Sequence, residues 1–139
     1  MSTRSMIAIK EGMEYRAIYC HSDGYPSHVG SVLLKNYTSM TKIQDLIALG
    51  ALSALDEEIG TKHEFDKRHL KECTAYHRDR DDAGPNVEVY TSEQELIDSF
   101  KESIDREWLY VWKHSQWYVM GSRVNDSGEL RLLNVSAET

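Results

Sequence analysis

The chain has 139 residues and a formal net charge of −7, with 40% hydrophobic and 28% charged residues. This length suits one domain with its own core, and the composition excludes a wholly disordered chain. No apolar run approaches the length that crosses a bilayer, so we expect no membrane association. The acidic balance opposes direct binding to nucleic acid, whose affinity comes mainly from neutralising phosphates.

The two cysteines indicate a compartment. The first residues of the chain lack the apolar stretch and cleavage site of a signal peptide. Cys20 and Cys73 are therefore expected to be reduced thiols in the cytoplasm rather than a disulfide.

In the first half of the chain, the side-chain pattern first alternates as in a strand, and the apolar residues then recur with the period of a helix. The elements expected there are strands over 5–10 and 15–20, a loop over 21–28, a helix over 27–37, and a second helix that Ser39 or Thr41 caps and Gly50 ends. The glycine-containing turn between the two strands predicts a hairpin.

The second half begins polar and ends aromatic. The elements expected there are a loop over 60–71, a strand over 72–78, a turn over 79–86, a strand over 87–90, a helix from a capping box of Ser92 and Glu95, and strands over 108–112, 116–120 and 129–133 with turns at 113–115 and 125–128. This order predicts an α+β domain: an antiparallel sheet with helices packed on one face and a C-terminal β-meander.

The segment 19–30 concentrates reactive side chains between a strand and a helix, where loops often carry function. Cys20 is a candidate nucleophile, with His21 or His28 as its base, which would make the protein a small hydrolase. Neighbours on a strand point to opposite faces, however, so His21 is badly placed to activate Cys20. A cysteine in this setting is more often a small buried hydrophobe.

The segment 73–80 suggests a ligand-binding face. If it is extended, Tyr76, Arg78 and Arg80 share one side, where an aromatic ring can stack on a base and guanidinium groups can hold phosphates. Asp79 then points the other way, to a ribose hydroxyl or to the turn. In the alternative reading, this is a solvated strand end whose arginines pair with nearby carboxylates.

Metal binding finds little support in the spacing of ligand-type residues. These residues are Cys20, His21, Asp23, His28, His63, His69, Cys73 and His77. No two cysteines are close enough in sequence for the usual structural zinc pattern. We therefore expect no metal and no cofactor.

The C-terminal strands carry an aromatic ladder. Its members are Trp108, Tyr110 and Trp112, with Trp117 and Tyr118 on the next strand. A stacking platform for bases is one reading, but cross-strand aromatics are more often core, and tryptophans also favour subunit interfaces.

Several motifs spread over the chain resemble a family of short uncharacterised proteins from phages, prophages and plasmids. They are Ser2-Thr3-Arg4-Ser5-x-Ile7-x-Ile9, Tyr19-Cys20-His21-x-Asp23-Gly24-Tyr25-Pro26-Ser27-His28-x-Gly30, Leu49-Gly50-x-Leu52-Ser53-x-Leu55, Tyr76-x-Arg78-Asp79-Arg80, and Tyr110-x-Trp112 followed by Gln116-Trp117-Tyr118-Val119. The chain departs from that family at Ser22, where many members have an aromatic residue, and at Asp81-Asp82, where many have Gly-Glu. The resemblance implies an accessory protein of a mobile element, located in the host bacterial cytoplasm.

The size and strand order are also similar to those of the phage anti-Thoeris sponges, which oligomerise and sequester cyclic nucleotide signals of host immunity. No binding residue of those proteins is matched position by position. The similarity implies a homo-oligomer that binds a small phosphorylated nucleotide and counters host defence. On this hypothesis Arg78 and Arg80 hold phosphates, Tyr76 stacks on the base, and a loop containing His21, Asp23, Tyr25 and His28 closes the site.

Two hypotheses from other classes stay open. One is the Cys20-dependent hydrolase. The other is a protein–protein inhibitor that uses its acidic surface to block a host defence enzyme, in which case binding would be salt-sensitive.

Overall fold

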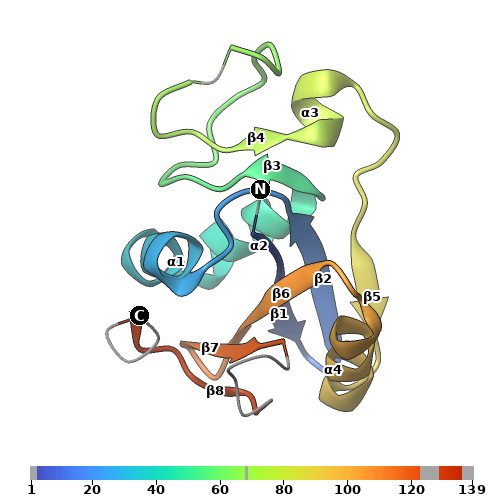
Figure 1. Cartoon of the computed structure of the whole chain (residues 1–139). Coiled ribbons are helices and arrows are strands. Elements are labelled where there is room, and N and C mark those ends of the chain that lie inside the picture. The colour runs from blue at the N-terminus through green and yellow to red at the C-terminus, as the bar shows by residue number, and fades with distance from the viewer. Residues whose placement is uncertain (1–2, 68, 123–128, 136–139) are drawn as a thin grey trace.

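One mixed sheet of eight strands forms the centre of the fold (Figure 1). The structure is a computed structural model that describes residues 3–67, 69–122 and 129–135. Across the sheet the strands are β4 (Thr74–Ala75), β3 (Leu52–Ala54), β2 (Glu14–Cys20), β1 (Arg4–Glu11), β6 (Arg106–Lys113), β7 (Gln116–Gly121) and β8 (Arg131–Leu132), and β5 (Glu88–Tyr90) pairs with β2 beside this path.

The expected hairpin forms the middle of the sheet, where β1 and β2 are antiparallel with Ile7 opposite Ile18. Two other pairs are parallel: β1 with β6, and β2 with β3. The α+β class and the C-terminal series of strands are confirmed, but the sheet is not antiparallel throughout. The reason is that β6 enters the sheet beside β1 after a long connection, running in the same direction as β1.

Five helical segments complete the described fold. They are a π-helical segment η1 (Pro26–Gly30), α1 (Ser31–Asn36), α2 (Met40–Ala48), α3 (Tyr76–Arg80) and α4 (Glu93–Glu102). The start predicted at Ser92 is confirmed, since Ser92 Oγ accepts from Glu95 N at 3.1 Å. Of the two caps expected for α2, Ser39 or Thr41, the structure has Ser39, whose Oγ accepts from Lys42 N at 3.2 Å. Gly50 follows α2 with φ of 76°, a conformation that favours glycine.

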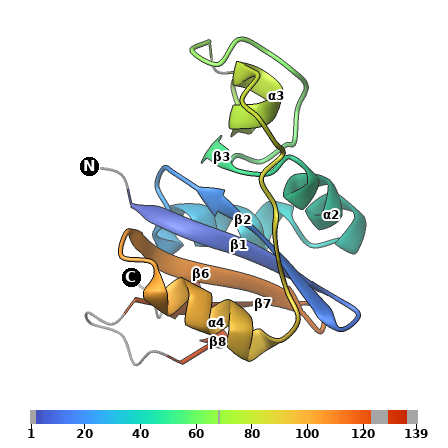
Figure 2. The same cartoon turned by 90° about the vertical axis from the view of Figure 1, so that its right-hand side faces the viewer.

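Helices cover both faces of the sheet, not one. Ile7, Ile18 and Tyr110 pack on the side of α1 and α2. Their strand neighbours Met6 and Leu109 pack on the opposite side, against α4. Figure 2 shows α4 on the viewer's side of the sheet, in front of β6 and β7. The alternation of β1, β2 and β6 therefore supplies two apolar faces, and a helix on each is needed to bury them.

The aromatic ladder is mainly core. Tyr110, Trp112 and Trp117 are buried under α1 and α2, and Trp108 packs partly buried against the same cluster. The indoles of Trp112 and Trp117 meet edge to face at 5.4 Å, and Trp117 Nε1 donates to Tyr37 O at 2.8 Å. Burial of these rings stabilises the contact between the C-terminal strands and the α1–α2 region.

The segment after the 60–71 loop differs most from expectation. A strand over 72–78 was predicted, but β4 covers two residues and α3 begins at Tyr76. The expected turn over 125–128 lies outside the described residues. Within the described ranges, no helix combines the length and apolar character that crossing a bilayer requires.

Candidate functional site

The side chain of Asp79 explains why residues 76–80 are helical. Its Oδ2 accepts from the backbone N–H of Ala75 at 2.8 Å, at the start of α3. Its Oδ1 accepts from the backbone N–H of His63, in the long loop between β3 and β4, at 3.1 Å. Asp81 then ends the helix with φ of 58°. Asp79, expected to face a ribose or a turn, is instead buried and holds the loop against α3.

Arg78 is part of the same structural network. Its guanidinium pairs with the Asp79 carboxylate, with Nε–Oδ1 of 2.9 Å and Nη2–Oδ2 of 3.1 Å. It also donates to Ile59 O and Cys73 O, each at 2.8 Å, and its side chain is only 15% exposed. Because these bonds use all three guanidinium nitrogens, Arg78 is poorly available to a phosphate. The premise that Tyr76, Arg78 and Arg80 share one face of a strand is wrong.

Tyr76 and Arg80 nevertheless share a face, because residues four apart in a helix are neighbours. The guanidinium of Arg80 lies 4.7 Å from the centre of the Tyr76 ring and 4.8 Å from that of Phe65. The two rings stack on each other with centroids 5.4 Å apart and an interplanar angle of 29°. We call this group of Phe65, Tyr76 and Arg80 the arginine–aromatic cluster.

The cluster is open to solvent and partly neutralised. The Arg80 side chain is 50% exposed, and it forms a two-point pair with Asp82, with Nε–Oδ1 of 2.9 Å and Nη2–Oδ2 of 2.7 Å. The hydrogen bond to Asp82 raises the pKa of Arg80, so its charge is permanent. Solvent screens this exposed pair, but its two-point geometry makes it stronger than a surface pair with a single contact.

Tyr19, at the end of β2, is joined to the first residue of the 21–28 loop by a hydrogen bond. Its hydroxyl forms a 2.7 Å hydrogen bond with His21 Nδ1, and the Arg106 guanidinium lies 5.4 Å from its ring centre. Burial raises the pKa of Tyr19; Arg4 and Arg106 oppose that shift, and Tyr76 adds to it.

The 21–28 loop is held firmly at its centre. Gly24 donates its N–H to Thr3 O at 2.8 Å, and the buried Tyr110 hydroxyl donates to Gly24 O at 2.6 Å. Asp23 has φ of 54° and accepts from the Tyr25 hydroxyl at 3.4 Å. The ring of His28 lies 6.4 Å from that of Tyr25. Asp23, Tyr25 and His28 thus form a small group of their own, and closure of this loop over α3 stays a prediction.

Cys20 is in a poor position for nucleophilic chemistry. The side chain is fully buried, and its thiol lies 3.8 Å from Ser22 O. Burial raises the pKa of Cys20 to about 12, so the reactive thiolate is disfavoured at neutral pH. His21, the neighbouring base, is bonded to Tyr19 instead.

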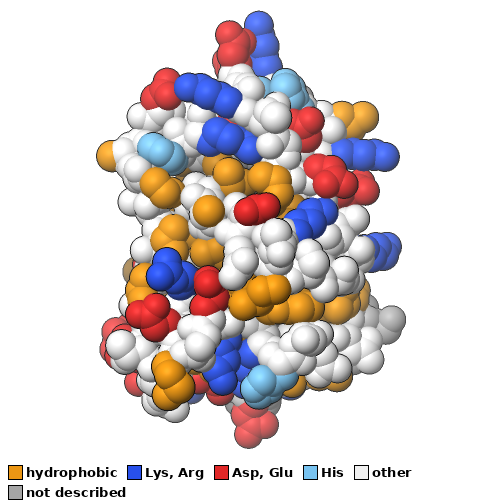
Figure 3. Space-filling model, turned by 180° about the vertical axis from the view of Figure 1, so that it is seen from behind, with side chains coloured by type: hydrophobic (Ala, Val, Ile, Leu, Met, Phe, Trp, Pro, Cys, Tyr) orange, Lys and Arg blue, Asp and Glu red, His pale blue; other side chains and the backbone are white. Residues whose placement is uncertain are grey.

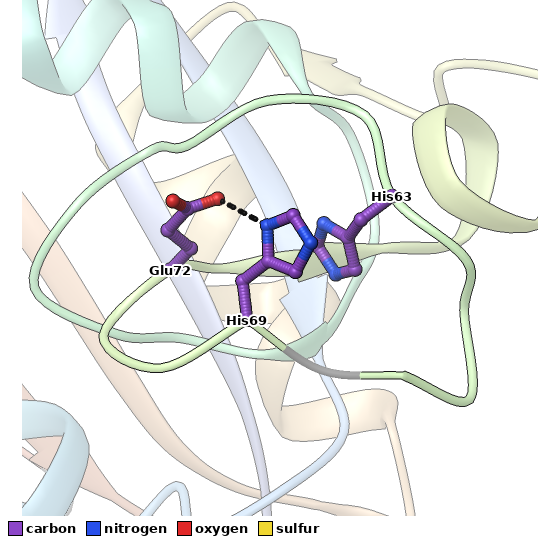
Figure 4. Close-up of side chains that lie close together, drawn as sticks. All are labelled: His63, His69 and Glu72. Atoms are coloured by element: carbon purple, nitrogen blue, oxygen red, sulfur yellow. Dashed lines mark hydrogen bonds and ion pairs between the residues drawn. The ribbon is translucent and has the colours of Figure 1, made fainter.

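Among the described residues, one group of three ligand-type side chains has its ligand atoms close together. His63, His69 and Glu72 each offer one atom, and these atoms lie within 4.8 Å of one another (Figure 4). The sequence named both histidines as ligand types but predicted no metal, because their spacing matches no common pattern.

Two grooves open elsewhere, beside Trp112. One has a volume of about 470 Å³ and is lined by Lys10, Met40 and His114 among others. The second, of about 290 Å³, includes Leu34 and Leu132. None of the residues predicted to bind a ligand lines either groove.

Charge is mixed on the face seen from behind the view of Figure 1. Lys and Arg side chains alternate there with Asp and Glu, and hydrophobic side chains reach the surface between them (Figure 3). On this face, the acidic side chains are not gathered into a single patch, and the inhibitor hypothesis stays a prediction.

Sequence reasoning missed two members of the candidate site. Phe65 carried a signal, as an aromatic residue in the polar 60–71 loop, but its partner in α3 is eleven residues away. Tyr19 was noticed only as part of the reactive segment.

Comparison of the chain with protein-family models, with curated proteins and with solved structures finds no match.

Proposed function

We propose that the protein binds and sequesters a small phosphorylated nucleotide at the arginine–aromatic cluster. The observation that carries this proposal is the exposed guanidinium of Arg80 lying over both Tyr76 and Phe65. A base or an adenine-like ring can stack on such aromatic side chains, and a guanidinium fork matches the oxygens of a phosphate.

The pair between Arg80 and Asp82 is compatible with this role. A phosphate that binds Arg80 would displace one solvent-exposed carboxylate, Asp82, and its oxygens match the same two-point guanidinium geometry. In this proposal, Arg80 alone has the phosphate-binding role that the sequence-based hypothesis gave to both Arg78 and Arg80. Arg78 becomes a positioning residue, since its bonds to Asp79 and to the carbonyl of Ile59 hold the loop that carries Phe65.

Residues around Tyr19 extend the proposed site. Tyr19 and His21 supply a phenol and an imidazole joined by a 2.7 Å hydrogen bond. Arg4 has a side chain 39% exposed and is paired with Asp105 at 3.7 Å. These groups could contact a ribose or a second phosphate of a ligand larger than a mononucleotide. The full burial of Cys20 favours binding over a thiol-dependent reaction.

The biological setting follows from the family resemblance. A phage or prophage accessory protein that sequesters a cyclic nucleotide signal would counter host defence without any catalytic group. The net charge of −7 suits this role, because it opposes binding to nucleic acid, whereas a small anion can bind at a single arginine. Homo-oligomerisation is part of the proposal.

The direct test is titration calorimetry with ADP, ADP-ribose and 3′,5′-cyclic AMP as probes. If a probe binds, Arg80→Ala should weaken binding by about tenfold or more. Tyr76→Leu should weaken it by roughly five- to 150-fold, the range for losing one stacked base. Arg16→Ala is the matched control, because Arg16 is a similarly exposed arginine, at 46%, on β2.

Native mass spectrometry of the protein from cells with nucleotide-based defence systems supplies a second test. A stoichiometric adduct of nucleotide mass, absent from Arg80→Ala, would support the proposal, and the same spectrum reports the oligomer mass. A protein that carries no adduct and binds none of the three probes would contradict it, as would equal affinity in the Arg80→Ala and wild-type proteins.

A further inference from the structure

The long loop between β3 and β4 contains a group of side chains that the proposed nucleotide site does not use. The ends of this loop are tied by Glu58 N–H to Lys71 O and by Cys73 N–H to Glu58 O, both at 2.9 Å. Between these ties the described residues form turns and irregular backbone rather than helix or strand. Loops of this length without regular structure are uncommon in compact domains, and many have a function.

His69 lies between the other two members of the group, as Figure 4 shows. Its Nδ1 is 3.0 Å from Glu72 Oε1, and its ring stacks on that of His63 with centroids 4.3 Å apart. Ligands of a tetrahedral metal at bond lengths near 2.0–2.1 Å are separated by about 3.3 Å. The Nδ1–Oε1 pair has nearly this spacing, and one nitrogen of each imidazole and one Glu72 oxygen lie within 4.8 Å of one another.

Hydrogen bonds around His63 prepare one ring nitrogen for a metal. Its Nδ1 is 2.9 Å from Thr61 O, and a carbonyl only accepts, so Nδ1 carries the proton. Nε2 then has a free electron pair, which meets only the hydroxyl of Thr74 at 3.3 Å. Metal-bound histidines usually donate their second nitrogen in this way, because the bond orients the ring.

The backbone makes room for the carboxylate. Gly60 has φ of 73°, and a Cβ atom at that position would overlap Glu72 Oε1. The same oxygen accepts from Thr61 N at 3.3 Å, so Glu72 is oriented by the segment that also orients His63. His63 itself is buried, and its backbone N–H is held by Asp79.

We propose that His63 Nε2, His69 Nδ1 and Glu72 Oε1 bind one divalent transition-metal ion of the zinc class. Two imidazoles and a carboxylate suit Zn²⁺, Co²⁺ and Ni²⁺, and three protein ligands leave a position for water. Binding replaces the His69–Glu72 and His63–Thr74 hydrogen bonds by metal bonds. Because a carboxylate only accepts, His69 Nδ1 carries the proton of its bond to Glu72, and this proton moves to Nε2, by way of solvent, before Nδ1 binds the ion. The ion would cross-link residues 63, 69 and 72 and so order the loop, independently of any nucleotide.

The test is titration of the full-length, chelator-treated protein with Zn²⁺ by calorimetry and with Co²⁺ by visible absorption, without nucleotide. Wild-type protein should bind one equivalent, and His69→Ala and Glu72→Gln should each weaken Zn²⁺ binding by about tenfold or more. Both side chains are partly or well exposed, so these variants retain the fold. His114→Asn, which changes an exposed histidine on the β6–β7 turn, should bind like wild type.

Thermal unfolding gives an independent readout. Zn²⁺ should raise the melting temperature of wild type and His114→Asn by more than that of His69→Ala, because an ion that binds only the folded state stabilises it according to its affinity. Equal Zn²⁺ affinity in wild type and in both ligand variants would overturn the proposal. So would the absence of wild-type binding at Zn²⁺ concentrations up to about 100 µM, since a weaker site would be of the order of chance surface binding.

Discussion

Arg78 and Asp79, adjacent in the chain, form one buried ion pair in which the guanidinium Nε lies 2.9 Å from the carboxylate Oδ1. The Asp79 side chain is fully buried, and it also accepts from the backbone of His63 and Ala75. Through this pair, α3 is fastened to the long loop that carries both Phe65 and the proposed metal ligands. Its removal should therefore disturb the two proposed sites together.

Arg78→Ala should lower the free energy of unfolding by about 3–5 kcal/mol, because it leaves the Asp79 charge buried without its partner. Arg78→Lys should also destabilise, since an ammonium cannot reproduce the planar fork that reaches Asp79, Ile59 O and Cys73 O. Urea unfolding measures both effects. Because Arg16 is exposed, Arg16→Ala should change the free energy of unfolding by less than about 0.5 kcal/mol. An unchanged urea midpoint for Arg78→Ala would refute the structural role of this arginine.

The stability of the protein should fall in acid, partly through Asp79. Burial raises the pKa of Asp79, but the hydrogen bonds from Arg78, Ala75 and His63 outweigh it, so the pKa is lower than its ordinary value of 3.8. A lowered pKa in the folded state adds stability above the unfolded value and loses it as the pH falls through the folded value.

Wild-type protein should therefore lose stability progressively from about pH 4 downward, whereas Asp79→Asn should show a shallower loss over the same range. At pH 7 the variant should be the less stable of the two. Urea unfolding at several pH values checks this difference. If the free energy of unfolding fell equally with pH in the two proteins, the fold would not be what holds Asp79 ionised.

Tyr110→Phe should loosen the 21–28 loop. The change removes the 2.6 Å hydrogen bond to Gly24 O and leaves that buried carbonyl without this donor, at a cost of about 1–3 kcal/mol. Hydrogen exchange should quicken in residues 21–28, and urea unfolding should report the loss of stability. Tyr25→Phe is the control, since the exposed Tyr25 hydroxyl makes only a 3.4 Å bond to Asp23. Similar effects of the two changes would show that Tyr110 does not anchor the loop.

Cys20 should resist iodoacetamide at neutral pH in the folded protein. Burial raises its pKa to about 12, and reagent access requires unfolding. Cys73, whose pKa burial also raises, should behave in the same way. Both thiols should react once urea unfolds the chain, as mass spectrometry of the labelled peptides would report. Fast labelling of native Cys20 near pH 7 would instead favour the hypothesis of a Cys20-dependent hydrolase.

Strands and helices repeat their side-chain directions at different intervals, and this difference explains why the sequence predicted the site only in part. In a strand, residues 76, 78 and 80 share a face; in a helix, 76 and 80 share a face but 78 turns away. The pairing of Tyr76 with Arg80 therefore survives either conformation. The phosphate-binding role expected for Arg78 is not supported, because in α3 its guanidinium pairs with Asp79. A five-residue helix is too short to be stable through its own propensity, so local pattern could not reveal it.

The sequence by itself determined the elements whose causes are local. Alternation predicted β1 and β2, the turn residues joined them, and Ser39 and Ser92 started α2 and α4, since strand faces and helix caps depend on neighbours in the chain. Only the tertiary structure decided which partners meet across distance: β6 parallel to β1, a helix on each face, and Asp79 buried against His63. These depend on contacts between segments far apart in sequence, where burial and hydrogen bonding outweigh local preference.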